Sequence, residues 1–273
     1  MALPLIPIAV IGGAKFISDI WQADKMSKEA LSVNYEAYTM VESASRKLQA
    51  QNEKLDGTLK KLANRKKGIM NTSLPKFVEI HNKVVQINFE KFHNVDISQS
   101  LTIPAESLNN INKMISVSGV SMTDKEILGT FLFSFEYGGL GGAIKKDARI
   151  NLDVAYTRSD EAEVIAHNID TTRIALEGIN AKAESLLKLL AQLNALFLKS
   201  MNYTAEIISR NGYQVENYSD EEIDAIMNCI NFAKALADIL KAPLFDSNGK
   251  LNNQINETLR IGNDYVKKIQ SIQ

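Results

Sequence analysis

The sequence predicts an all-α protein: an elongated helical bundle built on two long, antiparallel, coiled-coil-like helices, with shorter helices and an apolar, glycine-rich connector. The first observation is that the 273 residues contain only 5 prolines, so long stretches can remain helical. The second is that charged, proline-free sequence fills residues 24–70 and 160–209. The third is the spacing of the apolar residues within these two stretches.

Within residues 24–70, one line of apolar residues repeats every seven positions, at Val41, Leu48, Leu55, Leu62 and Ile69. The second heptad line is mixed, with apolar Leu31, Tyr38 and Leu59 but polar Ser45, Asn52 and Lys66. One continuous line beside an incomplete one is typical of a long helix packed in a bundle or hairpin. Residues 160–209 carry a matching apolar stripe, formed by Leu186, Leu189, Leu190, Leu193, Leu196 and Phe197.

The chain is expected to form an apolar N-terminal segment, residues 1–23, and a single elongated helical domain, residues 24–273. Because proline favours the first turn of a helix, Pro75 predicts that a second helix begins at Ser73. A short helix is expected near residues 105–115. Residues 149–157 alternate as a strand would, but the charged sequence around them favours a helix.

Helix ends are predicted from local signals. Glu126 follows Thr123 by three residues, and Glu222 follows Ser219 in the same way, so each pair predicts a capping box. Gly212 is expected to end the second long helix. The C-terminal helices are expected at about 219–241 and 250–272, with a turn between them at residues 246–249.

Composition argues against several classes of function. A net charge of −1 does not favour a nucleic-acid binder. The single cysteine, Cys229, excludes an internal disulfide and is expected to be a small buried side chain. The histidines His81, His93 and His167 have no metal-ligand spacing. We therefore expect a non-enzymatic protein with no catalytic residue, metal, cofactor or small-molecule substrate.

The N-terminal apolar segment (Ala2–Ala14) contains no charged residue. It is shorter than the roughly 20 residues that a membrane-spanning helix needs. It also lacks the basic residues that begin a secretory signal. A cytoplasmic protein, peripheral at a membrane, is therefore expected. It could contact a membrane or a partner, or pack on the protein's own helices. The predicted contact residues are Leu3, Leu5, Ile6, Ile8, Val10, Ile11 and Trp21.

The central apolar segment (Ile127–Ile144) carries Glu136 as its only charge. It barely reaches spanning length, and a central carboxylate is costly in lipid. We expect a hairpin tip that inserts partly or stays hidden until triggered; the alternative is a buried connector between the long helices. The predicted contact residues are Leu128, Phe131, Leu132, Phe133, Phe135, Leu140 and Ile144.

A basic stretch (residues 60–67) could contact an anionic surface through its cationic side chains. The alternative is that these cations complement the C-terminal end of the first long helix, which the same stretch is expected to occupy. The cationic residues are Lys60, Lys61, Arg65, Lys66 and Lys67.

The order of parts resembles a group of uncharacterised bacterial long-helix proteins with a glycine-rich apolar centre, sometimes described as glycine-zipper or chemotaxis proteins. The corresponding stretches here are IAVIGGAKF, KLDGTLKKL, FEYGGLGGAIKK, LLKLLAQLNALF and YSDEEIDAIMNCINFAKALADILKAPLFDSNGKL. The layout is also similar to that of α-helical pore-forming toxins and apolipoprotein-L-like proteins. That resemblance implies an apolar hairpin carried between long amphipathic helices. The centre of this chain is shorter and less apolar than in the bacterial group.

These features lead to two functional hypotheses. The first is a pore-forming-like, homo-oligomeric helical protein that associates conditionally with membrane lipid through both apolar segments, which stay hidden until they are triggered. The second is a soluble coiled-coil scaffold or adaptor that buries the same segments in a protein partner or in itself.

Overall fold

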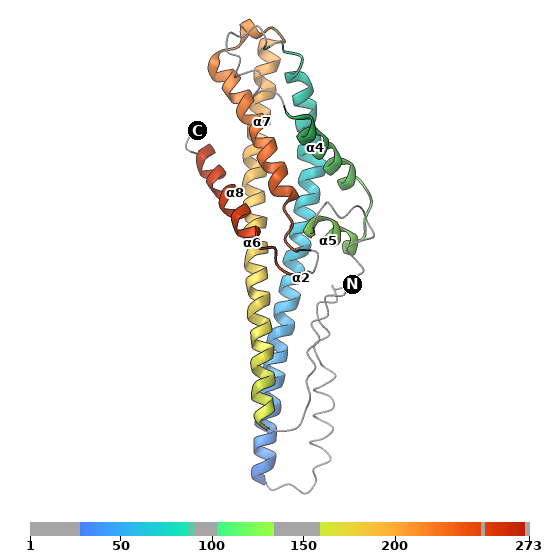
Figure 1. The fold of residues 1–273 in the computed structure, drawn as a ribbon, viewed down its shortest axis with the longest axis vertical. Helices are drawn as coiled ribbons and strands as arrows, with labels where there is room; N and C mark the ends of the chain where they lie inside the picture. Colours follow the sequence, from blue (N-terminus) through green and yellow to red (C-terminus); the bar gives the residue numbers. More distant parts are fainter. Residues whose placement is uncertain (1–27, 88, 90–102, 134–158, 247–248, 271–273) are drawn as a thin grey trace. The chain divides into compact units, whose positions relative to one another are not determined.

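A computed structural model gives the fold and describes residues 28–87, 89, 103–133, 159–246 and 249–270. Helices account for its regular structure (Figure 1): α2 (Lys28–Val84), α4 (Ala105–Ser118), α5 (Asp124–Leu132), α6 (Ser159–Asn211), the 3-10 turn η2 (Val215–Asn217), α7 (Asp220–Lys241) and α8 (Ile255–Gln270). No strand occurs in these residues, where Phe245 and Leu251 form an isolated β-bridge. The all-α prediction is confirmed.

The chain divides into two compact units. Unit 1 comprises residues 1–59 and 144–183, and its described part is a pair of helical segments from α2 and α6. Unit 2 comprises residues 60–143 and 184–273, where α4, α5, α7 and α8 join the remaining parts of α2 and α6. The predicted segment 1–23 and the ambiguous residues 149–157 lie outside the described residues.

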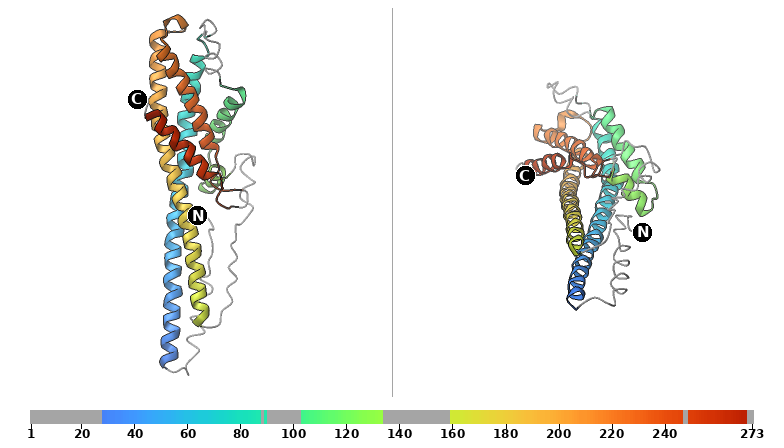
Figure 2. Two further views of the ribbon diagram at one scale, coloured as in Figure 1. Left: turned by 60° about the vertical axis from the view of Figure 1, so that its left-hand side comes forward. Right: turned by 60° about the horizontal axis from the view of Figure 1, so that its bottom comes forward.

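The two long helices run parallel. In unit 2, Ser73 Oγ donates to Asn194 Oδ1 at 2.7 Å, and Lys76 Nζ donates to Asn202 Oδ1 at 2.6 Å. The residue numbers increase together along both helices, and Figure 2 shows the same direction within unit 1. The antiparallel arrangement expected from the sequence is therefore wrong. Heptad spacing identifies a packed face but carries no direction, and α4 and α5 occupy part of a connection long enough to return the chain.

Helix α2 continues through Pro75 to Val84. The predicted end near residue 70 and the new start at Ser73 are therefore wrong. A proline inside a helix lacks the N–H that would bond the carbonyl four residues earlier. The adjacent Leu74 and Phe77 are 0 % and 1 % exposed, so burial of this turn in unit 2 offsets the lost hydrogen bond.

The predicted heptad line forms the packed face of α2. Leu48, Leu55, Leu62 and Ile69 are each at most 2 % exposed, while Val41 is half-buried. The predicted stripe of α6 is also packed: Leu186, Leu189, Leu190, Leu193 and Phe197 are each at most 1 % exposed, while Leu196 is half-buried. The spacing therefore locates the buried faces of both helices correctly.

A row of aromatic rings links the helices of unit 2. The ring of Phe197 lies 5.7 Å from that of Phe77 and 5.4 Å from that of Phe232, and Phe232 lies 5.2 Å from Tyr265 of α8. Helix α8 packs closely at Gly262, where an added Cβ would lie 2.4 Å from a methyl carbon of Leu189. This glycine has no side chain in the way, so α8 can approach α6.

Both predicted capping boxes are present. Thr123 caps α5 with Glu126, and Ser219 caps α7 with Glu222, each by reciprocal hydrogen bonds. Gly212 follows the last residue of α6 with a φ of 69°, which is the left-handed conformation expected at a helix C-terminus.

The last helix begins later than predicted. The turn after α7 extends to residue 254, because the Asp246 N–H donates to the Lys250 carbonyl at 2.8 Å and the Gln254 N–H donates to Asn252 Oδ1 at 2.9 Å. Helix α8 therefore starts at Ile255 rather than at residue 250. Asparagine bonding the backbone two residues ahead is a turn conformation that competes with helix.

Candidate functional site

The described part of the central apolar segment belongs to the core of unit 2. Leu128, Phe131 and Leu132 are 3 %, 1 % and 1 % exposed. Phe133 is half-buried, with its ring 5.3 Å from that of Phe245. The other predicted contact residues lie outside the described residues: Leu3, Leu5, Ile6, Ile8, Val10, Ile11, Trp21, Phe135, Leu140 and Ile144.

Helix α5 is fixed at both ends. At its start, the Thr123 N–H donates to Glu126 Oε2 at 2.8 Å, and this bond holds the pKa of the Glu126 carboxyl below its ordinary value. At its end, the Leu132 carbonyl accepts the N–H groups of Leu244 and Phe245 at 2.9 and 3.0 Å. Exposing this part of the segment would therefore break specific contacts as well as expose apolar surface.

Helices α2 and α6 begin at the same end of unit 1 (Figure 1). The N-terminal apolar segment ends at Ala14, before α2 starts at Lys28, and the central apolar segment ends at Ile144, before α6 starts at Ser159. In the sequence, each apolar segment therefore precedes the start of one of these two helices. None of the described helices combines the length and apolar character needed to cross a membrane.

The basic stretch is divided by the fold of unit 2. Lys66 is 1 % exposed, and its ammonium donates to the Ala242 carbonyl at the C-terminal end of α7 at 2.6 Å. Burial lowers the pKa of Lys66 to about 7. Lys67 donates to the Val120 carbonyl at 3.2 Å. These two lysines therefore bind backbone carbonyls of the protein itself.

The other three cationic residues line a groove between α2 and α6 in unit 2. We call it the basic groove; its volume is about 600 Å³, and its lining residues are Lys60, Lys61, Asn64, Arg65, Gly68, Ile69, Thr72, Leu187 and Asn194. No acidic residue is among them. The sequence identified the cations but missed the polar partners, because Asn194 reaches the groove only through the parallel register of the helices.

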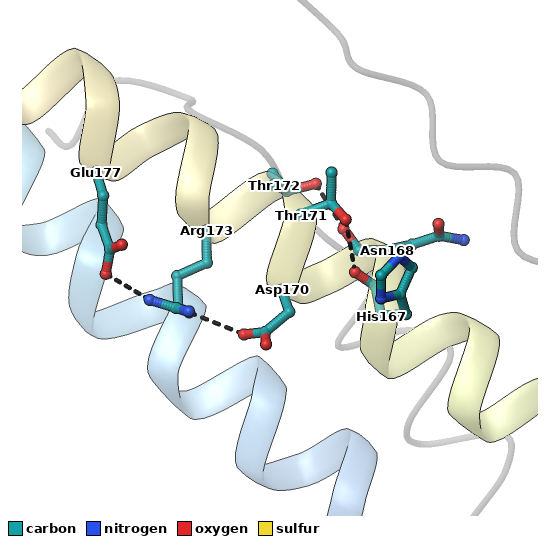
Figure 3. Close-up of polar contacts among 7 residues, drawn as sticks. All are labelled: His167, Asn168, Asp170, Thr171, Thr172, Arg173 and Glu177. Carbon is teal, nitrogen blue, oxygen red and sulfur yellow. Dashed lines mark hydrogen bonds and ion pairs between the residues drawn. The ribbon is translucent and has the colours of Figure 1, made fainter.

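Unit 1 carries a row of polar contacts along α6 (Figure 3). Arg173 Nε donates to Asp170 Oδ1 at 2.8 Å, and Arg173 also pairs with Glu177. The bond from Arg173 lowers the pKa of Asp170, with a smaller contribution from Lys47 of α2. Exposed ion pairs of this spacing stabilise a helix only weakly, so the row supports α6 and offers no reactive group.

The core of unit 2 buries a histidine and a cysteine, two residue types that often take part in catalysis. His81 is 5 % exposed, and neither ring nitrogen has a hydrogen-bond partner; burial, and then Lys234, lower its pKa. Cys229 is 1 % exposed, and burial raises the pKa of its thiol, which disfavours the reactive thiolate. Among the described residues no cluster of His, Cys, Asp or Glu is placed to hold a metal ion.

Comparison with protein families, with curated proteins and with solved structures found no match to this chain.

Proposed function

We propose that this protein is a non-enzymatic, homo-oligomeric helical protein that associates conditionally with a membrane through its two apolar segments, in the manner of a pore-forming protein. The observation that carries the proposal is the parallel pairing of α2 and α6 in unit 1. An antiparallel pair would bring the starts of the two helices to opposite ends of unit 1. In the parallel pair both starts lie at one end, and the proposal is that the apolar segments that precede them in the sequence reach the same membrane surface.

Joint insertion compensates for the weakness of each segment. The N-terminal apolar segment is too short to span, and the central one carries Glu136. Shallow insertion needs no spanning length, and its strength scales with the apolar area that leaves water. Two segments that insert together supply more such area than either segment alone.

The association is conditional because part of the central apolar segment already lies in the core. Burying a large apolar side chain contributes about 1.5–3 kcal/mol, so exposing Leu128, Phe131 and Leu132 would cost roughly 5–9 kcal/mol. Insertion therefore uses the part of the segment after Leu132, unless a trigger first releases α5 from unit 2.

Vesicle flotation tests the proposal. We expect the full chain to float with anionic phospholipid vesicles, and Ile8→Asp and Leu140→Asp each to lower the floated fraction, because a carboxylate opposes insertion. The matched control is Ile261→Asp, at a 49 % exposed position of α8, which should float like the wild type. Equal recovery of all four proteins in the lipid-free fraction would contradict membrane association.

The burial of Leu128, Phe131 and Leu132 favours a second candidate function, a soluble scaffold or adaptor that keeps its apolar segments covered. That function predicts a defined oligomer or complex whose mass, measured by light scattering, is unchanged by vesicles. It also predicts that Ile8→Asp and Leu140→Asp change this mass without any effect of lipid.

A further inference from the structure

We propose that the basic groove of unit 2 binds a ligand that carries two or more phosphate groups. The ligand can be a soluble polyphosphate or the headgroup of a phosphorylated lipid. The inference goes beyond the proposed function, because a soluble polyphosphate would occupy the groove without any membrane.

The charge of the groove is the first argument. Lys61 and Arg65 are both exposed and stand four residues apart on α2, so their like charges face each other. Within the described residues neither forms an ion pair with an acidic side chain. Lys60 adds a third cationic side chain to the lining. A bound anion would relieve this repulsion, and the planar guanidinium of Arg65 can bind a phosphate through two hydrogen bonds.

The open space beside Gly68 is the second argument. Glycine inside a helix is about 1 kcal/mol less favourable than alanine. At Gly262 a close neighbour explains the glycine, whereas at Gly68, as at Gly57 and Gly178, an added Cβ would meet no atom within 4 Å. Gly68 lines the basic groove one helical turn from Arg65. Its missing side chain therefore widens the groove and lets a ligand approach the helix backbone.

The orientation of Asn194 is the third argument. Its Oδ1 accepts the hydroxyl proton of Ser73 at 2.7 Å, and Ser73 is 2 % exposed. This bond fixes the side-chain amide, so that its Nδ2 group remains as a donor within the groove lining. Cations on α2 and an amide donor on α6 thus flank a volume of about 600 Å³, which is within the usual range for small-ligand sites.

Isothermal titration with inositol hexakisphosphate is the first arm of the test. We expect the wild type to bind and the double variant Lys61→Gln/Arg65→Gln to bind at least about tenfold more weakly, because two charge-assisted contacts are lost. The matched control, Lys113→Gln/Lys267→Gln, removes two exposed cations outside the groove and should stay within about twofold of the wild type.

A pair of substitutions at Gly68 separates the effect of filling the groove from the effect of changing its charge. Gly68→Gln and Gly68→Glu add side chains of similar size to the open space, but only Glu adds a negative charge. We expect both to weaken binding and Glu to weaken it more. Circular dichroism of each variant confirms that the helices remain folded, since nothing within 4 Å obstructs a Cβ at this position.

The second arm uses phosphatidylcholine vesicles with and without a bisphosphorylated phosphatidylinositol. Binding to the soluble probe identifies a soluble polyphosphate, whereas a groove-dependent gain on the doped vesicles alone identifies a lipid headgroup. Failure of the wild type to bind either probe, or equal losses in the groove variant and the control variant, would overturn the proposal. Flotation of Ile8→Asp and Leu140→Asp with anionic vesicles reports the membrane association proposed above, because both variants keep the groove, so the two proposals can fail separately.

Discussion

Replacing Lys66 by methionine should stabilise the protein at neutral and acid pH. Lys66 is 1 % exposed and donates to the Ala242 carbonyl at 2.6 Å. Folding therefore moves an ammonium from water into the core of unit 2, where one carbonyl at the C-terminal end of α7 is its recorded partner. Methionine keeps a similar unbranched shape without a charge.

The pKa of Lys66 determines the size and the sign of the change in the free energy of unfolding. Burial lowers this pKa from 10.5 to about 7. Between these two values the unfolded chain binds a proton that the folded protein does not bind. The free energy of unfolding therefore rises with pH over this window, by up to about 1.4 kcal/mol per pH unit from this group. Below pH 7 the buried charge costs the full difference, about 5 kcal/mol at 1.36 kcal/mol per pKa unit.

The substitution also leaves the Ala242 carbonyl without its donor, which costs about 1–3 kcal/mol. Lys66→Met should therefore raise the free energy of unfolding by about 2–4 kcal/mol near pH 6. The gain should shrink as pH rises above 7 and become a loss near pH 10, where the buried lysine costs little and the missing donor to the Ala242 carbonyl remains.

Urea unfolding followed by far-ultraviolet circular dichroism, at a series of pH values from about 6 to 10, measures this difference. Other titrating groups cancel when variant and wild type are compared at each pH. Lys61→Met is the control, because this exposed side chain should change stability by less than about 0.5 kcal/mol at any pH. A variant-minus-wild-type difference that stays constant across the range would refute the reasoning.

Three further outcomes are expected. His81 has a folded pKa below its ordinary value, so the unfolded chain binds more protons in acid and stability should fall as pH drops below about 6.5; His81→Phe should flatten this dependence in acid unfolding curves, and an unchanged slope would contradict it. Gly262→Ala should cost about 1–3 kcal/mol through overpacking against Leu189, whereas Gly68→Ala should gain about 0.5–1 kcal/mol; thermal melts giving both variants the same sign would contradict this pair. Phe197→Ala should cost about 3–5 kcal/mol in urea unfolding, because it removes the central ring of the aromatic row; a cost below about 1 kcal/mol would show that the row contributes little.

Local signals in the sequence predicted the local structure well. The heptad line from Leu48 to Ile69 is buried, both capping boxes form, and Gly212 follows the end of α6. Each of these depends on interactions within a few residues or on which face of one helix is apolar. The helix start predicted from Pro75 is wrong, because burial of Leu74 and Phe77 outweighs this local signal.

The candidate site was predicted only in part, because its assembly depends on pairing between distant residues. The sequence located the cations of the basic stretch but could not separate Lys66, which binds the end of α7, from Arg65, which lines the basic groove. The side chains of adjacent residues in a helix point about 100° apart. Arg65 and Lys66 therefore contact different parts of the protein. Those contacts are known only when the direction and register of α6 are known.

The parallel arrangement of α2 and α6 also has a consequence for how the chain folds. The contact of Ser73 with Asn194 joins residues 121 positions apart, so no short hairpin can nucleate this helix pair. By contrast, α6 and α7 are joined by a bond from Asn211 to Glu222, 11 positions apart. Closing a long loop costs more chain entropy and slows folding. We therefore expect the turn between α6 and α7 to form early and the pairing of the two long helices to be a late, rate-limiting step.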